Sequence, residues 1–385
     1  MGKKTIQISK NSLIPKQDIR MEKDECYKEE GYNMVVFCHL RWAFVYQRPQ
    51  HLISRMAKHY KVLFVEEPLT LEDDGEGNNF HLEIIHKNLH ILKPKVKNIE
   101  DIKNILHPLL NNCNLELGWF YSAAFSPLLT DFKFETVVYD CMDELSLFKG
   151  APQELITQEK FLLSEAHVVF TGGKSLYESK INTHKNVHCF PSSVDRKHFS
   201  AALENIEIPE DLIKIKKPVI GYFGVIDERI NLSLLQDTAK LLPNMAFVMI
   251  GPLAKIIEED LPREENIHYL GMKSYDSLPN YLRGFDIAMM PFALNDATKF
   301  ISPTKTLEYM AAGKPIVSTA IKDVVRDYSH CISIIESAQE FAKTLEDIWR
   351  VYSPDNTASY EEILQNTSWD TTANRMIKQI KSVAS

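Results

Sequence analysis

"FDIAMMPFALNDATKFISPTKTLEYMAAGKPIVST", residues 285–319, carries the clearest structural pattern of this chain. The stretch begins with the apolar run FDIAMMPF, continues through a polar loop and a helical segment, and ends in a second apolar run, KPIVST. Short apolar runs of this kind are typical of buried strands, and a helix between two of them joins parallel strands. The stretch therefore predicts one strand, helix and strand unit of a parallel sheet that helices cover on both faces.

The same alternation extends over most of the chain in two series. The first series contains the apolar runs MVVFCHL, KVLFVEE, LHILKP, LELGWFYS, TVVYDCMD and AHVVFTGG, and the second contains PVIGYFGVI, MAFVMIG, NIHYLG, FDIAMMPF, KPIVST and CISIIE. A polar, proline-containing stretch separates them, as a linker between compact halves does. We predict an α/β protein with two doubly wound parallel-sheet, Rossmann-like domains, whose ligands bind in a cleft beyond the carboxyl ends of the strands.

The predicted domain boundaries follow from these two series. The start of the chain mixes charges without periodicity, which predicts a flexible extension, and the end has the pattern of an amphipathic helix that returns toward the first domain. The predicted parts are 1–32 (extension), 33–200 (first domain), 201–217 (linker), 218–366 (second domain) and 367–385 (returning helix).

The composition narrows the classes of partner and compartment. The 385 residues include 44 basic and 52 acidic side chains, a net charge of −8, and no basic stripe, which argues against a nucleic-acid partner. Short polybasic patches are compatible with peripheral contact between the protein and the inner membrane surface. The six cysteines form no C-x-x-C pair and no apolar segment is long enough to span a bilayer, so we expect a cytoplasmic protein.

Two further patterns argue against a bound metal ion or nicotinamide cofactor. His184 and His188 are four residues apart, but the segment runs from a helix end into a strand and loses the geometry of a metal site. The glycine pairs in TGG and IGP do not form the G-x-G-x-x-G fingerprint. We therefore expect neither a metal ion nor a cofactor.

The helical part of the opening stretch has recognisable end signals. Ser302 is a favourable N-cap, Pro303 suits the first helical position, and Gly313 fits the left-handed residue that closes a helix. Within the helix Lys305 and Glu308 are neighbours, because residues three apart share a face.

This pair has two interpretations. The first is a solvent-exposed ion pair, which stabilises a protein by only a few tenths of a kcal/mol. The second is a diphosphate site, because a helix start offers free N–H groups and a partial positive charge. Lys305 adds a full cation where the helix dipole disfavours one, and Glu308, about one turn further, is placed to accept hydrogen bonds from a ribose diol.

Several stretches of the chain resemble one known family. They are SPTKTLEYMAAGKPIVST, GYFGVIDERINLSLL, HYLGMKSYDSLPNYL, VVYDCMDELSLFKGAP and VYQRPQHLISRMA. They look like the bacterial nucleotide-sugar glycosyltransferases of the GT-B fold, and specifically like a subgroup often encoded beside UDP-galactopyranose mutase. The resemblance runs from about Asn33 to the end, and it implies that the second domain binds the sugar nucleotide and the first binds the acceptor.

The resemblance also implies roles for individual residues. Glu308 matches a family glutamate that binds the ribose, and Lys305 matches a lysine used on the diphosphate. Arg229 falls near basic residues that the wider family uses, and Lys273 in LGMKS is expected beside the nucleobase. The other residues of the predicted donor site are Ser302, Thr304 and Gly224.

One position departs from the family pattern. The broad retaining family carries a second glutamate eight positions before Glu308, where this chain has Phe300, so the outcome, retention or inversion, stays open. Inversion needs a base on the acceptor side, and the candidates are Asp140, Asp143 and His39. The alternative is that the aspartates cap the following helix and that His39 is only a hydrogen-bonded strand-end residue.

The acceptor candidates lie in RWAFVYQRPQHL, at a junction between a loop and a helix. They are Trp42, Gln47 and Arg48. Trp42 either stacks on an acceptor sugar or seals the first core, and Arg48 reaches either a phosphate or acceptor group or only a neighbouring carboxylate.

The expected function follows from the resemblance. It is the transfer of a hexose from a nucleotide sugar, expected to be UDP-linked, to a glycan or lipid-linked acceptor in cell-surface polysaccharide synthesis, without a metal ion. Two alternatives stay open: a nucleotide-sugar epimerase of the same fold, and a non-catalytic protein that binds sugar nucleotides.

Overall fold

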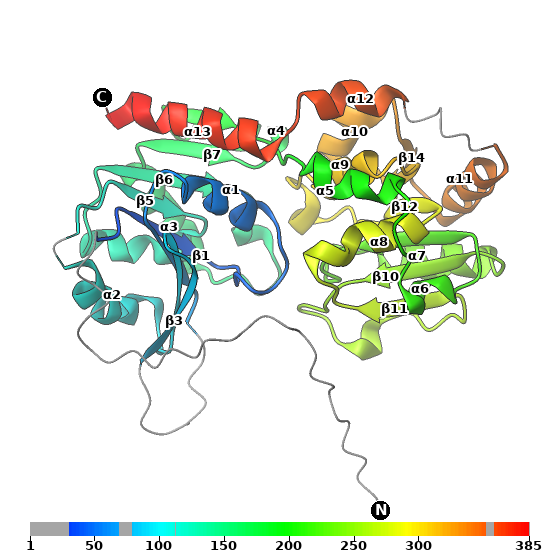
Figure 1. The fold of residues 1–385 in the computed structure, drawn as a ribbon, viewed down its shortest axis with the longest axis horizontal. Coiled ribbons are helices and arrows are strands. Elements are labelled where there is room, and N and C mark those ends of the chain that lie inside the picture. Colours follow the sequence, from blue (N-terminus) through cyan, green and yellow to red (C-terminus); the bar gives the residue numbers. More distant parts are fainter. Residues whose placement is uncertain (1–30, 69–78, 112, 352–357, 385) are drawn as a thin grey trace, which may run out of the picture.

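The computed structural model describes residues 31–68, 79–111, 113–351 and 358–384, so the predicted extension lies almost wholly outside the described residues. The described chain forms two sheets, one of eight strands and one of six, each with helices packed around it (Figure 1). The predicted α/β class with parallel sheets is confirmed.

The first sheet has the strand order β3-β4-β2-β1-β5-β6-β7-β8, and all its pairs are parallel except that of β3 with β4. Its strands are β1 (Met34–Cys38), β2 (Val62–Glu66), β3 (Phe80–His86), β4 (Leu89–Pro94), β5 (Leu117–Phe120), β6 (Thr136–Cys141), β7 (Val168–Thr171) and β8 (Val187–Cys189).

Strand β1 shows why these segments are continuous apolar runs. Val35 and Phe37 belong to one apolar cluster, whereas Met34, Val36 and Cys38 belong to another. Successive residues of a strand point to opposite faces, so the two clusters lie on the two faces of the sheet. A central strand of a sheet covered on both faces has no solvent-facing side, and polar residues would cost free energy at any of its positions.

Strand β3 is an element that the sequence analysis did not predict. This strand pairs antiparallel with β4 at the edge of the sheet, and the two are joined by a turn of two residues, Lys87 and Asn88. Such a hairpin needs no crossover helix, so the strand and helix alternation does not reveal it. The strand's mixed sequence, FHLEIIH, leaves Ile84 and Ile85 exposed and lacks the apolar run that marks the buried strands.

The helices and 3-10 segments of the first half connect these strands. They are α1 (Arg48–Met56), η1 (Ile99–Ile102), α2 (Lys103–Leu110), η2 (Ala123–Thr130), η3 (Leu145–Leu147), α3 (Glu154–Glu165) and α4 (Lys174–Lys180). None of the helices in the described part of the chain, in either half, is both long enough and apolar enough to cross a bilayer.

The second sheet has the strand order β11-β10-β9-β12-β13-β14, and every pair is parallel. Its strands are β9 (Val219–Phe223), β10 (Ala246–Ile250), β11 (Ile267–Gly271), β12 (Ile287–Met290), β13 (Ile316–Thr319) and β14 (Ser333–Ile335). The opening stretch supplies β12, helix α9 (Lys305–Ala311) and β13, with β12 and β13 paired in parallel, so the predicted unit is confirmed.

The segments that surround the second sheet come mostly from the second half of the chain. They are α5 (Arg196–Ser200), η4 (Ala201–Leu203), α6 (Glu210–Ile213), α7 (Leu232–Leu241), η5 (Glu258–Asp260), η6 (Tyr275–Ser277), α8 (Leu278–Gly284), η7 (Asp296–Thr298), α10 (Lys322–Tyr328), α11 (Ala338–Val351) and α12 (Ala358–Gln365).

The chain crosses from one sheet to the other twice. Val194 and Phe199 already pack in the core of the second sheet. The predicted boundaries assign them to the first domain, because the polar residues around them gave no sign of a core position. At the other end of the chain, helix α13 (Trp369–Ala384) packs against α1 and contributes Trp369, Met376 and Ile380 to a core cluster of the first sheet (Figure 1, red).

Candidate functional site

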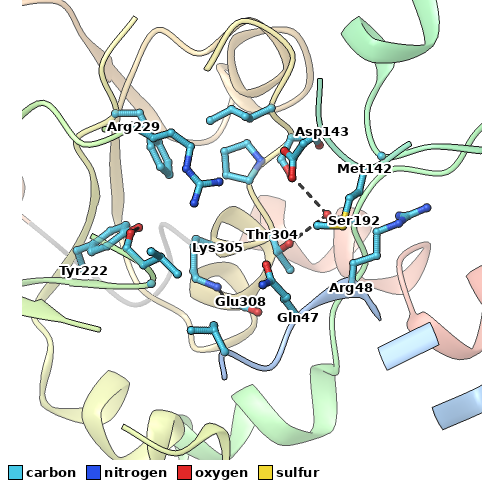
Figure 2. Close-up of a pocket in the computed structure, with 18 residues that line it drawn as sticks. Gln47, Arg48, Met142, Asp143, Ser192, Tyr222, Arg229, Thr304, Lys305 and Glu308 are labelled. Atoms are coloured by element: carbon cyan, nitrogen blue, oxygen red, sulfur yellow. Dashed lines mark hydrogen bonds and ion pairs between the residues drawn. The ribbon is translucent and has the colours of Figure 1, made fainter. Parts of the chain in front are cut away.

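A pocket of about 120 Å3 lies where segments that follow strands of both sheets meet (Figure 2). In doubly wound sheets the carboxyl ends of the strands form the ligand-binding edge. The first sheet contributes Gln47, Arg48, Met142 and Asp143 to the lining, and the second contributes Tyr222, Gly224, Arg229, Ser302, Thr304, Lys305 and Glu308.

Helix α9 borders the pocket, and it begins later than the sequence predicts. Its first residue is Lys305, and Thr304 occupies the N-cap position, so the prediction of Ser302 as N-cap is wrong. The Thr304 hydroxyl donates instead to Ser192 Oγ at 3.0 Å, a contact that joins this turn to the segment after β8. The left-handed residue that ends the helix is confirmed, since Gly313 has φ +63°.

Lys305 and Glu308 form an ion pair inside the pocket. Lys305 Nζ lies 2.9 Å from Glu308 Oε2, and the two side chains are only 16% and 3% exposed. The interpretation of the pair as solvent-exposed is therefore wrong. Lys305 Nζ also lies 4.9 Å from the centroid of the Phe223 ring. A largely buried pair of this kind contributes little net stability, because desolvation of the two charges offsets their attraction.

Arg229 comes from the same sheet as Lys305 and points toward the centre of the pocket in Figure 2. Its Nη2 donates to Asp227 Oδ2 at 2.7 Å, and its Nε lies 3.0 and 3.1 Å from the two carboxylate oxygens. Burial alone would lower the pKa of Arg229, but the hydrogen bonds and charge of Asp227 raise that pKa above its ordinary value. Arg229 is therefore a permanent cation at the pocket.

Asp143 faces this cation from the first sheet. Burial raises the pKa of its carboxyl from 3.8 to about 6, although the charge of Arg229 acts in the opposite direction. The N-cap position of the following η3 is Glu144, so the capping alternative does not describe Asp143. A carboxyl group with a pKa near 6 at a pocket wall can accept a proton at neutral pH.

Asp140 does not lie at the rim of the cleft, and that prediction is wrong. The residue is fully buried, and its carboxylate accepts from Arg48 Nε at 3.2 and 3.1 Å and from Arg48 Nη2 at 2.8 Å. Arg48 Nη1 donates in turn to the carbonyl oxygen of Phe190 at 2.7 Å. Of the two interpretations of Arg48, the structure shows the contact with a neighbouring carboxylate. The buried pair connects the start of α1 to β6.

Three other predicted residues lie outside the pocket lining. His39 has a buried Nδ1 without a hydrogen-bond partner among the described residues, and burial together with the charge of Lys255 lowers its pKa to about 4. Trp42 packs edge-on against Phe64, 5.1 Å between ring centroids, as the core-sealing alternative proposed. Lys273 Nζ donates to Asp211 at 2.7 Å instead of reaching the pocket.

The structure adds pocket residues that the sequence did not single out. Tyr222 lies within strand β9, where its apolar neighbours hid it, and its hydroxyl donates to the carbonyl oxygen of Val225 at 3.1 Å. Met142 and Ser192 follow β6 and β8. Their position after a strand was a usable signal, because residues there face the ligand-binding edge. In the described part of the chain no cluster of three or more His, Cys, Asp or Glu could hold a metal ion.

Comparisons with known sequences find likeness to glycosyltransferases. Residues 217–350 match the family model described as glycosyl transferases group 1. A protein of Bacillus subtilis (strain 168), named as a teichuronic acid biosynthesis glycosyltransferase, TuaH, is 23% identical over 290 residues, which are 68% of this chain and 70% of that protein.

Comparisons with solved structures extend the likeness to both domains. Sucrose-phosphate synthase from Thermosynechococcus elongatus matches 91% of this chain and 98% of its own with 13% identity and a TM-score of 0.69. Anabaena HepE in complex with UDP and glucose matches 91% of this chain and all of its own, 100%, with 12% identity and a TM-score of 0.66. The chain thus has the GT-B fold, and its residues 217–350 are similar to the glycosyl transferases of group 1.

Proposed function

We propose that this protein transfers a hexose from a UDP-sugar to a glycan or lipid-linked acceptor in the synthesis of a cell-surface polysaccharide. The group 1 domain, a relative named for teichuronic acid biosynthesis, and the UDP and glucose bound to HepE support the proposal. On this proposal the protein works in the cytoplasm, with its acceptor presented at the inner membrane surface. The association with UDP-galactopyranose mutase stays a prediction.

One observation carries this proposal: cations of the second sheet face a carboxyl group of the first across one pocket. Lys305 and Arg229 line one side and Asp143 lines the other. Transfer from a nucleotide sugar requires stabilisation of the leaving diphosphate and alignment of an acceptor hydroxyl. The two cations supply the first requirement without a metal ion, and Asp143 supplies a proton acceptor for the second.

On this proposal Glu308 orients the donor by binding its ribose. Its carboxylate is 3% exposed and its described hydrogen bond is the one from Lys305. Two carboxylate oxygens have about four acceptor positions, so the pair with Lys305 leaves room for a ribose diol. The nucleoside then lies beyond Glu308 and the diphosphate between Lys305 and Arg229.

The size of the pocket limits how much of the donor it can hold. Its volume of about 120 Å3 is below the roughly 300–1,000 Å3 of typical sites for small molecules. On this proposal the pocket holds the diphosphate and part of the sugar, and the rest of the nucleotide sugar extends beyond it.

A thermal-shift panel tests the proposal. UDP, GDP, ADP and TDP with their common sugars are added to the wild type, to Glu308→Ala, and to the exposed control Glu336→Ala. A ligand at about one hundred times its Kd stabilises the folded protein by roughly 2.7 kcal/mol. We expect UDP and a UDP-sugar to stabilise the wild type and the control, and to lose most of this effect in Glu308→Ala.

The outcomes separate the alternatives. Stabilisation by no nucleotide, or an equal shift in Glu308→Ala, contradicts a donor site at this pocket. Conversion of a bound UDP-sugar into its epimer without any acceptor favours the epimerase alternative, and binding without turnover of any acceptor tested favours a non-catalytic role.

A further inference from the structure

The segment that follows β6 reaches from the first domain to the second. We call residues 142–150 the Phe148 loop; it includes Asp143 and η3. The backbone N–H of Lys149 lies 3.2 Å from both carboxylate oxygens of Glu228, and η3 packs against η7 of the second domain. The loop therefore docks onto the segment that carries Arg229.

The ring of Phe148 makes the central contact of this docking. Lys255 Nζ lies 4.5 Å and Arg229 Cζ 5.6 Å from the ring centroid. Cations within about 6 Å of an aromatic face are attracted to it. Lys255 is held in turn by Glu228, 3.3 Å from its Nζ. One aromatic side chain of the first domain thus contacts two cations of the second.

The backbone at Lys255 supports a specific role for this contact. Lys255 has φ +60°, a left-handed conformation that residues other than glycine seldom adopt. Such a conformation costs of order 1 kcal/mol and persists where surrounding contacts hold it in place. Here the strained residue carries one of the two cations that meet Phe148.

Arg229 is held on two sides. Its Nε and Nη2 are bound to Asp227, and its guanidinium lies over Phe148. Among the described residues none accepts a hydrogen bond from Nη1, and Arg229 lines the pocket. The arrangement leaves the Nη1 donors for a ligand while two neighbours restrict the rest of the side chain.

We propose that Phe148 is a positioning residue for Arg229 and that the donor site reaches its binding geometry only when the Phe148 loop is docked. This inference rests on the proposed function, since it assigns Arg229 to the donor diphosphate. The same loop carries Asp143, so docking brings the proton acceptor and the oriented cation to the pocket together. A preorganised cation binds a diphosphate more tightly because less freedom is lost on binding.

Titration of UDP and of uridine by calorimetry tests this proposal. The proteins are the wild type, Phe148→Leu, Phe148→Tyr, and the control Phe161→Ala, which removes a partly exposed ring on α3 of the same domain. We expect Phe148→Leu to weaken UDP binding about three- to tenfold and to leave uridine binding unchanged. Phe148→Tyr, which keeps the aromatic ring, and Phe161→Ala should both stay within about twofold of the wild type.

A double-mutant cycle isolates the coupling. In an Arg229→Ala background, Phe148→Leu should have no further effect on UDP, because the two residues act through one interaction. Equal losses for UDP and uridine, or additive losses in the cycle, overturn the proposal. So does a Phe148→Leu protein that binds UDP like the wild type while Arg229→Ala weakens it. Failure of the wild type to bind UDP is a separate outcome, which overturns the proposed function and this inference with it.

Discussion

Lys305 gains little net stability from its ion pair with Glu308. It lies 16% exposed beside a carboxylate that is 3% exposed. Both groups lost most of their hydration, and the attraction between buried charges often does no more than balance that loss. The proposed function explains the pair: it assigns the lysine ammonium and the glutamate oxygens to different parts of one ligand.

The first prediction concerns Lys305→Ala. Its affinity for UDP should fall about ten- to hundredfold, as expected for a lost hydrogen bond to a charged group, while uridine binding changes by less than about twofold. Calorimetric titration of both ligands measures the difference. Lys322→Ala, on the exposed side of α10, is the matched control. A similar loss for uridine would show that the substitution damages the pocket as a whole.

The second prediction concerns the protonation of Asp143. Its folded-state pKa is raised to about 6, so the group is protonated below that pH and a carboxylate above it. A general base must be deprotonated, and the rate should therefore fall as pH decreases through about 6. The measurement is kcat/KM for UDP release from the UDP-sugar that stabilises the wild type, between about pH 5 and 8.

The Asp143→Asn variant checks this assignment. It should bind UDP like the wild type and lose about two to four orders of magnitude in turnover, together with the acidic limb of the profile. Arg229, Asp227, Arg48 and Lys255 are the charged groups that act on the Asp143 carboxyl. An unchanged acidic limb in the variant would assign the titration to another group.

At the scale of single residues, the sequence predicted some of the residues that line the pocket, but it did not show which of two aspartates lies there. Lys305 and Glu308 could be paired because helical spacing is local. Asp140 and Asp143 could not be separated from the sequence, since both stand at the end of the same apolar run. Only the ion pair with Arg48, distant in sequence, shows that the charge of Asp140 already has a partner. Long-range partners of this kind leave no local pattern.

At the scale of secondary-structure elements, a carboxylate of the second domain caps the start of a helix in the first domain. Helix α4 begins after Gly173, and Asp323 of α10 accepts from the Ser175 N–H at 3.1 Å from each oxygen and also from the Ser175 hydroxyl. Asp323 is 2% exposed. A carboxylate at a helix start satisfies free N–H groups, so α10 does for α4 what a local N-cap residue does elsewhere.

The third prediction follows from this shared cap. Asp323→Ala should lower the free energy of unfolding by about 1–2 kcal/mol, and Asp323→Asn by less, because an amide oxygen still accepts from Ser175. Urea unfolding measures the change. Lys174 and Lys322 also form ion pairs across this interface, but both are about half exposed, so Lys322→Ala should cost less than about 0.5 kcal/mol. A loss from Lys322→Ala as large as that from Asp323→Ala would contradict the shared cap.

The sequence predicted elements best where their signal is local and continuous. The buried strands were visible as apolar runs, and the end of α9 was visible from Gly313. Strand β3 and the start of α9 were not, because an edge strand needs only one apolar face and because Thr304 turns toward Ser192 instead of continuing a regular cap. In both cases a contact with another segment of the chain decided the outcome.

At the scale of the whole molecule, the last helix makes the first domain depend on the end of the chain. Helix α13 follows the second domain in sequence, yet Trp369 packs in a core cluster of the first sheet and its ring stacks on His51 at 4.8 Å. His51 also contacts the Tyr275 ring of the second domain, 5.5 Å between centroids. The helix therefore covers the first core at the point where the two domains meet.

The fourth prediction uses this arrangement. Trp369 is 1% exposed, so Trp369→Ala should cost about 3–5 kcal/mol, as expected for removal of a buried aromatic side chain. Because the contacts of Trp369 are with the first sheet, the substitution should destabilise the first domain. Hydrogen exchange should become faster in β6, β7 and α1 and stay unchanged in β10 and β12. Trp349→Ala, on the exposed face of α11, is the matched control and should cost less than about 0.5 kcal/mol. Faster exchange confined to the second sheet in Trp369→Ala would mean that α13 stabilises the domain it follows and not the one it covers.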